Sequence, residues 1–201
     1  MKAVHPAPQL VVLAAGFSAR LGRSKALARI RGMTLLRRTL GILSPLSATG
    51  RIIVVVPKRA GRYRLECASR GTSFVENPRR ATGLSSSVRA GVWRARQFPA
   101  VLLLPVDLAA LKQVDVARMI SRWRGRRRQV IARRVHEHAG SPVILPRWLY
   151  PRVADLTGDR GLRDMLRHLP AEAITLISLP SAVADVDTPQ DLVRARAFSK
   201  R

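Results

Sequence analysis

The segment that most constrains this chain is residues 10–27, where a short apolar run passes into a loop of small and basic residues. Residues 10–13, Leu-Val-Val-Leu, are continuously apolar, as expected for a buried strand. Residues 14–16, Ala-Ala-Gly, carry little or no side chain, so the backbone can approach a ligand and offer N–H groups to phosphate oxygens. Arg20 and Lys25 then add positive charge. The segment predicts a nucleotide site at the tip of a strand in an open α/β sheet.

This loop differs from the two best-known phosphate-binding loops. Five residues separate Gly16 from Gly22, and Lys25 follows two residues later than a P-loop requires. The sequence G-x-G-x-x-G does not occur in the chain. The alternative interpretation is therefore a plain surface loop after a strand, with basic residues there by chance.

Apolar runs suited to strands recur along the chain and alternate with segments of helical spacing. Continuously apolar strands that alternate with helices predict a mostly parallel sheet covered by helices on both faces. We expect one Rossmann-like α/β domain over residues 1–201, with its core at residues 9–196. The expected strands are residues 10–13, 51–56, 72–75, 100–104, 130–132, 142–145 and 174–179. Apolar faces of expected helices lie at residues 35–43, 88–95, 116–123 and 162–169.

Composition narrows the class of protein. A chain of 201 residues, 47% of them hydrophobic, can bury one substantial core. No apolar run approaches the ~20 residues of a membrane span, and residues 1–10 lack the apolar centre of a signal peptide. The single cysteine, Cys67, excludes an internal disulfide and fits a reducing compartment. We expect a cytoplasmic protein without a membrane partner.

The chain is strongly basic. Lys and Arg number 37 against 12 Asp and Glu, a formal net charge of +25, and the densest basic cluster lies at residues 122–134. Such a field attracts polyanions. The aromatic residues are few and do not alternate with the basic ones as base-stacking platforms do. We interpret the charge as a solvated surface and expect no nucleic-acid partner, although attraction of a triphosphate and an anionic co-substrate fits either interpretation.

Asp107 stands at the end of the apolar run 100–104 and is one of few acids in the chain. A carboxylate at the carboxyl end of a strand lies where open α/β sheets bind ligands. Magnesium is held by one or two carboxylates together with substrate phosphates, so Asp107 is a candidate metal ligand. The alternative is an ordinary helix N-cap or turn residue.

A second carboxylate group lies at residues 185–191, Asp-Val-Asp-Thr-Pro-Gln-Asp. Thr188 followed by Pro189 predicts the start of a helix. Either Asp187 or Thr188 could cap that helix, and Asp191 is expected on its surface. Two carboxylates from distant strands could converge on one Mg²⁺.

A third polar element covers residues 76–88, where an expected strand passes into an expected helix. Gly83 frees the backbone, and the serines at 85–87 offer hydroxyl and N–H groups at a helix N-terminus, which favours an anionic ligand. Plain N-capping by serine is an equally good interpretation. His136 and His138 have no cysteine partner nearby and do not indicate a zinc site.

These elements, in this order, resemble one known family. Residues 13–25 resemble L-A-A-G-x-S-x-R-x-G-x-x-K, and residues 185–192 resemble D-x-D-T-P-x-D-L, of the molybdenum-cofactor cytidylyltransferases within the MobA-like NTP transferases. Residues 77–87 resemble the family's N-P-x-x-x-x-G-x-x-x-S, residues 140–143 its G-x-P-V, and residues 158–163 its G-D-x-G-x-R, which places Arg163 at the arginine position. The sequence at 107–109, Asp-Leu-Ala, departs from the family's D-x-P.

The resemblance implies a fold of the nucleotide-diphospho-sugar transferase type, a reaction and a set of site residues. A terminal phosphate of a molybdopterin-type acceptor would attack the α-phosphorus of CTP, and a molybdoenzyme or its maturation chaperone could be a further partner. An alanine before the glycine goes with cytidylyltransferases in this family, and a methyl that narrows the space beside the backbone would favour a pyrimidine. The implied catalytic residues are Arg20, Lys25 and Asp107, with Asp107 and Asp187 holding Mg²⁺. The implied nucleotide-binding residues are Leu13, Ala14, Ala15, Gly16, Asn77, Gly83 and Ser87.

Three alternatives remain open from the sequence. The nucleotide could be GTP, or the acceptor could be another phosphorylated small molecule. A different class of function is an Arg-rich RNA-binding protein on a degenerate nucleotidyltransferase scaffold.

Overall fold

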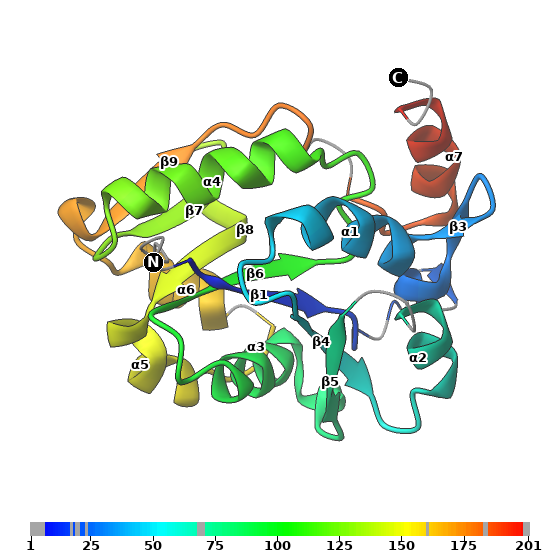
Figure 1. The fold of residues 1–201 in the computed structure, drawn as a ribbon, viewed down its shortest axis with the longest axis horizontal. Helices are drawn as coiled ribbons and strands as arrows, with labels where there is room; N and C mark the ends of the chain where they lie inside the picture. Colours follow the sequence, from blue (N-terminus) through cyan, green and yellow to red (C-terminus); the bar gives the residue numbers. More distant parts are fainter. Residues whose placement is uncertain are drawn as a thin grey trace.

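The computed structural model describes residues 7–16, 18, 21–22, 24–67, 71–159, 161–182 and 185–198. Its centre is a seven-stranded sheet in the order β5-β4-β1-β6-β8-β7-β9 (Figure 1). The strands are β1 (Gln9–Leu13), β4 (Ile52–Pro57), β5 (Thr72–Asn77), β6 (Ala100–Pro105), β7 (Val130–Val135), β8 (His138–Pro146) and β9 (Ile174–Ile177).

The sheet is mixed but mostly parallel. β1 pairs in parallel with β4 and β6, β4 with β5, and β7 with β9, whereas β8 is antiparallel to both β6 and β7. Strand β1 lies inside the sheet, between β4 and β6, and is fully buried, with Leu and Val on both of its faces. The predicted α/β class and mostly parallel sheet are confirmed.

Helices cover both faces of the sheet, because alternate residues of each strand face opposite ways. Leu10 and Val12 pack in a cluster with α1 (Leu35–Leu43), α2 (Gly61–Cys67) and α4 (Gln113–Gly125). Val11 and Leu13 pack on the other face with α3 (Leu84–Arg94), α5 (Tyr150–Ala154) and α6 (Gly161–Arg167). Figure 1 shows α1 and α4 on one side of β1 and β6, and α3 and α6 on the other.

Helix α3 approaches β1 closely at Gly91. A Cβ on this glycine would lie 2.6 Å from Val11 Cγ1, so a larger residue would push the helix off the sheet. This close contact holds α3 against the middle of β1.

A third apolar cluster joins the start and the end of the chain. The hairpin of β2 (Arg29–Ile30) and β3 (Met33–Thr34) packs through Ile30 against Leu192 and Ala195 of α7 (Pro189–Phe198). Val186 belongs to the same cluster, so the packing of α7 holds the acidic segment at 185–187 over the sheet edge. Short 3-10 turns complete the fold at Lys25–Leu27, Ser44–Leu46, Arg80–Thr82, Arg147–Leu149 and Ala171–Ala173.

The expected strands and helices are present, with different lengths at several ends. β7 and β8 extend toward each other into a hairpin that the sequence did not predict, and the last strand ends at Ile177 rather than at residue 179. The hairpin β2–β3 and the short helices α2 and α5 were not predicted either. None of the described helices is long and apolar enough to cross a bilayer.

Candidate active site

The candidate site lies at the carboxyl ends of β1 and β6, two parallel neighbours in the sheet. A cavity of about 500 Å³ opens there between the tip of β1, the N-terminal end of α3 and the acidic segments. A second cavity, of about 680 Å³, adjoins it through Gly16 and Ser18. The first cavity is lined by Leu13, Ala14, Gly16, Ser18, Lys25, Ala26, Leu84, Ser87, Pro105, Val106, Asp107, Asp159 and Asp187.

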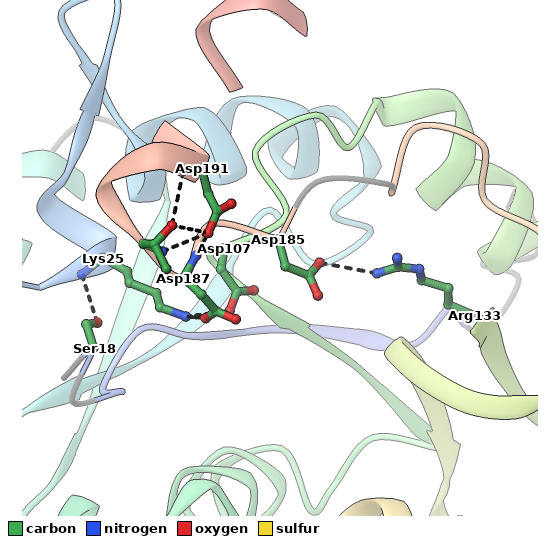
Figure 2. A network of polar contacts seen from close by, with 8 residues as sticks. Ser18, Lys25, Asp107, Arg133, Asp185, Asp187 and Asp191 are labelled. Carbon is green, nitrogen blue, oxygen red and sulfur yellow. Dashed lines mark hydrogen bonds and ion pairs between the residues drawn. The ribbon is translucent and has the colours of Figure 1, made fainter. Parts of the chain in front are cut away.

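Three of the predicted site residues meet in one charged cluster (Figure 2). Lys25 Nζ lies 3.3 Å from Asp107 Oδ2 and also contacts Asp187 Oδ1. In the sequence, Asp107 lies 82 residues after Lys25 and Asp187 lies 162 residues after it. The side chains of Lys25 and Asp107 are only 17% and 24% exposed, whereas that of Asp187 is 46% exposed.

The cluster is electrostatically coupled. Burial raises the pKa of Asp107, Lys25 opposes this rise, and the carboxylates of Asp185 and Asp187 add to it, with a net increase. Burial lowers the pKa of Lys25, but Asp107 and Asp187 outweigh burial, so that its pKa lies above the ordinary value. Lys25 is therefore a charged ammonium in this site.

Backbone hydrogen bonds bring the two acidic segments together. The Asp107 carbonyl accepts hydrogen bonds from the N–H groups of Ala109 (2.9 Å) and Val186 (3.0 Å). Leu108 forms an isolated antiparallel bridge with Asp185. Asp107 thus lies in a tight turn after β6, and the segment that leads to α7 is hydrogen-bonded to that turn.

The structure shows which residue of the second acidic group caps α7. Thr188 Oγ1 accepts a hydrogen bond from Asp191 N–H (3.2 Å), while Asp191 Oδ2 accepts from the N–H groups of Thr188 (2.8 Å) and Asp187 (3.1 Å). This reciprocal arrangement is a capping box. The hydrogen bond from the Thr188 hydroxyl to Asp191 Oδ2 (2.7 Å), together with those from the two N–H groups, lowers the pKa of Asp191. Since Thr188 and Asp191 cap the helix, the Asp187 carboxylate is left to contact Lys25.

Asp185 has a different partner. Arg133 Nη1, on β7, lies 3.5 Å from Asp185 Oδ1 and donates to the carbonyl of Ser141 (3.4 Å). Figure 2 shows Asp185 directed toward Arg133, on the other side of the cluster from Lys25. Asp187 rather than Asp185 therefore shares the Lys25 ammonium with Asp107.

Across the cavity from the charged cluster, Asn77 organises the start of α3 and lines the second cavity. Its side chain is 3% exposed; Nδ2 donates to Ser86 Oγ (2.8 Å) and Ser87 Oγ (3.0 Å), and Oδ1 accepts from Arg79 N–H (3.0 Å). All of these partners belong to the protein itself. Asn77 therefore positions the helix, while Ser87 lines the cavity.

Gly83 and Asp159 form a second junction on that wall. Gly83 has φ +97°, and a Cβ there would lie 2.5 Å from the carbonyl carbon of Gly158, so only glycine fits. Asp159 Oδ1 accepts from Leu84 N–H (2.8 Å), and the Gly158 carbonyl accepts from Ser85 N–H (3.1 Å). From the sequence, residues 158–161 were interpreted as a family motif or a turn; that Asp159 caps α3 and lines the cavity was not predicted.

The tip of β1 divides into residues that line the cavity and one that does not. Leu13, Ala14 and Gly16 line it, and Ala14 N–H donates to the carbonyl of Val55 (2.9 Å). The methyl group of Ala15 is fully buried in the apolar cluster on the α3 face. It does not narrow the cavity by direct contact, so the steric reason predicted from the sequence for a pyrimidine preference does not apply in that form.

A hydrogen bond between Ser18 and Lys25 stabilises the loop after β1. Ser18 Oγ accepts a hydrogen bond from Lys25 N–H (2.9 Å), and Ser18 itself has φ +54°, a conformation that is rare for residues other than glycine. This contact, which the sequence analysis did not predict, fixes the backbone of Lys25. Arg20 lies outside the described residues.

The two carboxylates are suited to a hard cation. In the described part of the chain, no three His, Cys, Asp or Glu side chains are grouped as metal ligands. Magnesium needs no such cage, because it retains water molecules and binds substrate phosphates alongside one or two carboxylates. Asp107 and Asp187 therefore fit a cation that is completed by a phosphorylated substrate.

The chain is similar in sequence and in structure to known proteins. Residues 10–173 match the family described as MobA-like NTP transferase domain. A segment of 86 residues is 44% identical to the "Bifunctional IPC transferase and DIPP synthase" of Rubrobacter xylanophilus, covering 40% of this chain but only 20% of that protein. Rv0371c of Mycobacterium tuberculosis H37Rv superposes with a TM-score of 0.76 at 26% identity, over 94% of this chain and 98% of that chain.

A structure of Rv0371c in complex with manganese superposes with a TM-score of 0.73 at 24% identity, over 95% of this chain and 98% of that chain. The family match includes the loop after β1 and Asp107 and ends before Asp187. Because the matched residues span most of the sequence, the chain belongs to the MobA-like NTP transferase domain family.

Proposed function

We propose that this chain transfers CMP from CTP to the terminal phosphate of a molybdenum cofactor, with a divalent cation and with release of pyrophosphate. Family membership supports nucleotidyl transfer from an NTP to a phosphorylated small molecule. CTP and the molybdopterin acceptor rest on the motif resemblance. The observation that carries the proposal is the convergence of Lys25, Asp107 and Asp187 beside the open tip of β1.

In this reaction an oxygen of the acceptor phosphate attacks the α-phosphorus of the nucleotide as the bond to pyrophosphate breaks. Such a transfer needs positioning and charge neutralisation more than a protein nucleophile. Lys25, together with Arg20, would bind the triphosphate and stabilise the departing pyrophosphate. The backbone at residues 14–16 and the N-terminal end of α3 would contact the nucleotide.

Asp107 and Asp187 would hold the cation, which neutralises phosphate charge when bound. The manganese complex of the structurally similar Rv0371c supports a divalent cation in this fold. Magnesium is the cation we propose, because the two available ligands are carboxylates.

A second acceptor class is favoured by one observation. The segment that is 44% identical to the bifunctional IPC transferase and DIPP synthase of R. xylanophilus supports a phosphorylated small molecule other than the molybdenum cofactor. GTP in place of CTP also remains a candidate, because Ala15 does not line the cavity.

Pyrophosphate release tests these choices together. The chain is incubated with CTP or GTP, with Mg²⁺, Mn²⁺ or EDTA, and with molybdenum cofactor or a panel of phosphorylated small molecules. We expect metal-dependent release with CTP and molybdenum cofactor. Release with a different acceptor would replace the molybdenum assignment, and predominance of GTP would replace the cytidylyl assignment. Salt-sensitive RNA binding without turnover of any NTP would contradict the enzyme proposal and favour a binding protein.

A further inference from the structure

The ammonium of Lys25 occupies the position between the two candidate metal ligands. It contacts both Asp107 and Asp187, and among the described residues it is the cation paired with either of them (Figure 2). The neighbouring acids have other partners: Asp185 pairs with Arg133, and Asp191 with Thr188 and Arg194. Lys25 is thus the internal counter-ion of this carboxylate pair.

The pair requires such a counter-ion. Two carboxylates held close together repel each other, and partial burial weakens their hydration. Asp107 is only 24% exposed, and its side chain has Lys25 as its one hydrogen-bond donor among the described residues. A divalent cation and a lysine ammonium would therefore compete for the same oxygens.

A bound triphosphate would change this competition. Lys25 lines the same cavity as the tip of β1 and Ser87, so phosphate oxygens placed there would lie within reach of its flexible side chain. The backbone of Lys25 is anchored by the hydrogen bond from its N–H to Ser18 Oγ. Its ammonium can therefore exchange partners while the main chain stays in place.

We propose that Lys25 neutralises Asp107 and Asp187 in the nucleotide-free protein and transfers to the triphosphate when a metal–nucleotide complex enters, so that the cation binds with the nucleotide and not before it. The inference rests on the proposed function in that cation and nucleotide share this cavity. It adds a binding order and a second role for a single lysine.

Direct Mn²⁺ binding, measured by electron paramagnetic resonance of the free ion, tests the exchange without any acceptor. The samples are the full chain, Lys25→Met, and Lys112→Met as a control, since Lys112 is an exposed lysine that does not line the cavity. Without nucleotide, we expect Lys25→Met to bind Mn²⁺ about tenfold or more tightly than the unsubstituted chain and the control, because Asp107 and Asp187 are then left without their cationic partner. A non-hydrolysable CTP analogue should tighten Mn²⁺ binding to the full chain and remove the advantage of Lys25→Met.

Equal Mn²⁺ affinity of the full chain and Lys25→Met without nucleotide would overturn the exchange. If Lys25→Met does not fold without metal, the full chain alone still decides: the account requires Mn²⁺ binding to depend on the CTP analogue, and tight binding of Mn²⁺ alone contradicts it. Pyrophosphate release is measured in parallel. A full chain that binds Mn²⁺ only with the analogue but never releases pyrophosphate would contradict the proposed function and leave the exchange standing.

Discussion

The two walls of the cavity are built from different kinds of contact. On the α3 wall, the side chains of Asn77 and Asp159 form hydrogen bonds with serine hydroxyls and a backbone N–H group of α3. On the opposite wall, the side chains of Lys25, Asp107 and Asp187 have hydrogen bonds only with each other among the described residues. Residues of both walls belong to the motifs of the same family. The partners of each side chain, and not its place in a motif, indicate whether it shapes the site or is free for a ligand.

The largest effect is expected at Asp107. Asp107→Asn keeps the shape of the side chain and the backbone hydrogen bonds from Ala109 and Val186, so the fold should remain intact. Loss of a charged metal ligand should remove several kcal/mol of transition-state stabilisation and abolish metal-dependent pyrophosphate release. Asp155→Asn, at an exposed carboxylate, is the matched control. Turnover of Asp107→Asn near that of the control would exclude Asp107 from the site.

A large effect is also expected at Lys25. Lys25→Ala should lower kcat/KM for the triphosphate by ~10²-fold or more, because a charge-assisted contact to phosphate is lost. Lys112→Ala should not change it. Arg20→Ala is expected to match Lys25→Ala. Steady-state kinetics with CTP measures all three, and normal kinetics in both Lys25→Ala and Arg20→Ala would make this loop structural.

Asn77 should show the opposite balance, with stability affected more than chemistry. Asn77→Ala removes the buried hydrogen bonds from Asn77 Nδ2 to Ser86 Oγ and Ser87 Oγ and should lower the free energy of unfolding by about 1–3 kcal/mol. Gln97→Ala, at an exposed amide, is the control. Urea denaturation measures the change. If Asn77→Ala instead kept full stability and lost turnover, Asn77 would be a ligand-binding residue and the contrast between the two walls would fail.

The smallest effect is expected at Ala15. Its methyl is buried in the core, so Ala15→Gly should cost about 1–2 kcal/mol of stability. The preference for CTP over GTP, expected at roughly 10- to 200-fold in the full chain, should change by less than about threefold. Competition between equal CTP and GTP measures the preference. Its collapse in Ala15→Gly would show that the methyl acts on the base through the backbone.

Local sequence patterns correctly predicted the strands and helices that position this site. The tip of β1 and Asp107 were found because each follows a continuous apolar run, and a strand of that kind has to end at the sheet edge. Helices α1, α3, α4 and α6 were found by the helical spacing of their apolar residues. In contrast, the apolar residues of α2 are Tyr63, Leu65 and Cys67, which alternate rather than follow helical spacing, and Leu65 is exposed.

The remaining features depend on contacts between distant residues. The β7–β8 hairpin continues through Arg133 and Arg134, where backbone pairing persists although the apolar run has stopped. Asp159 caps α3 from 75 residues away. The sequence left the cap of α7 open between Asp187 and Thr188 and placed Asp191 on the helix surface, because the side-chain directions that bring Asp191 into the cap cannot be read from it.

The most direct test of the site is the crystallographic position of Mn²⁺ bound together with a non-hydrolysable CTP analogue, located by its anomalous scattering. The account predicts one peak within ligand distance of a carboxylate oxygen of Asp107, one of Asp187 and a phosphate oxygen, with Lys25 Nζ moved onto the triphosphate. A peak away from both carboxylates, or Lys25 still between them with the nucleotide bound, would contradict it.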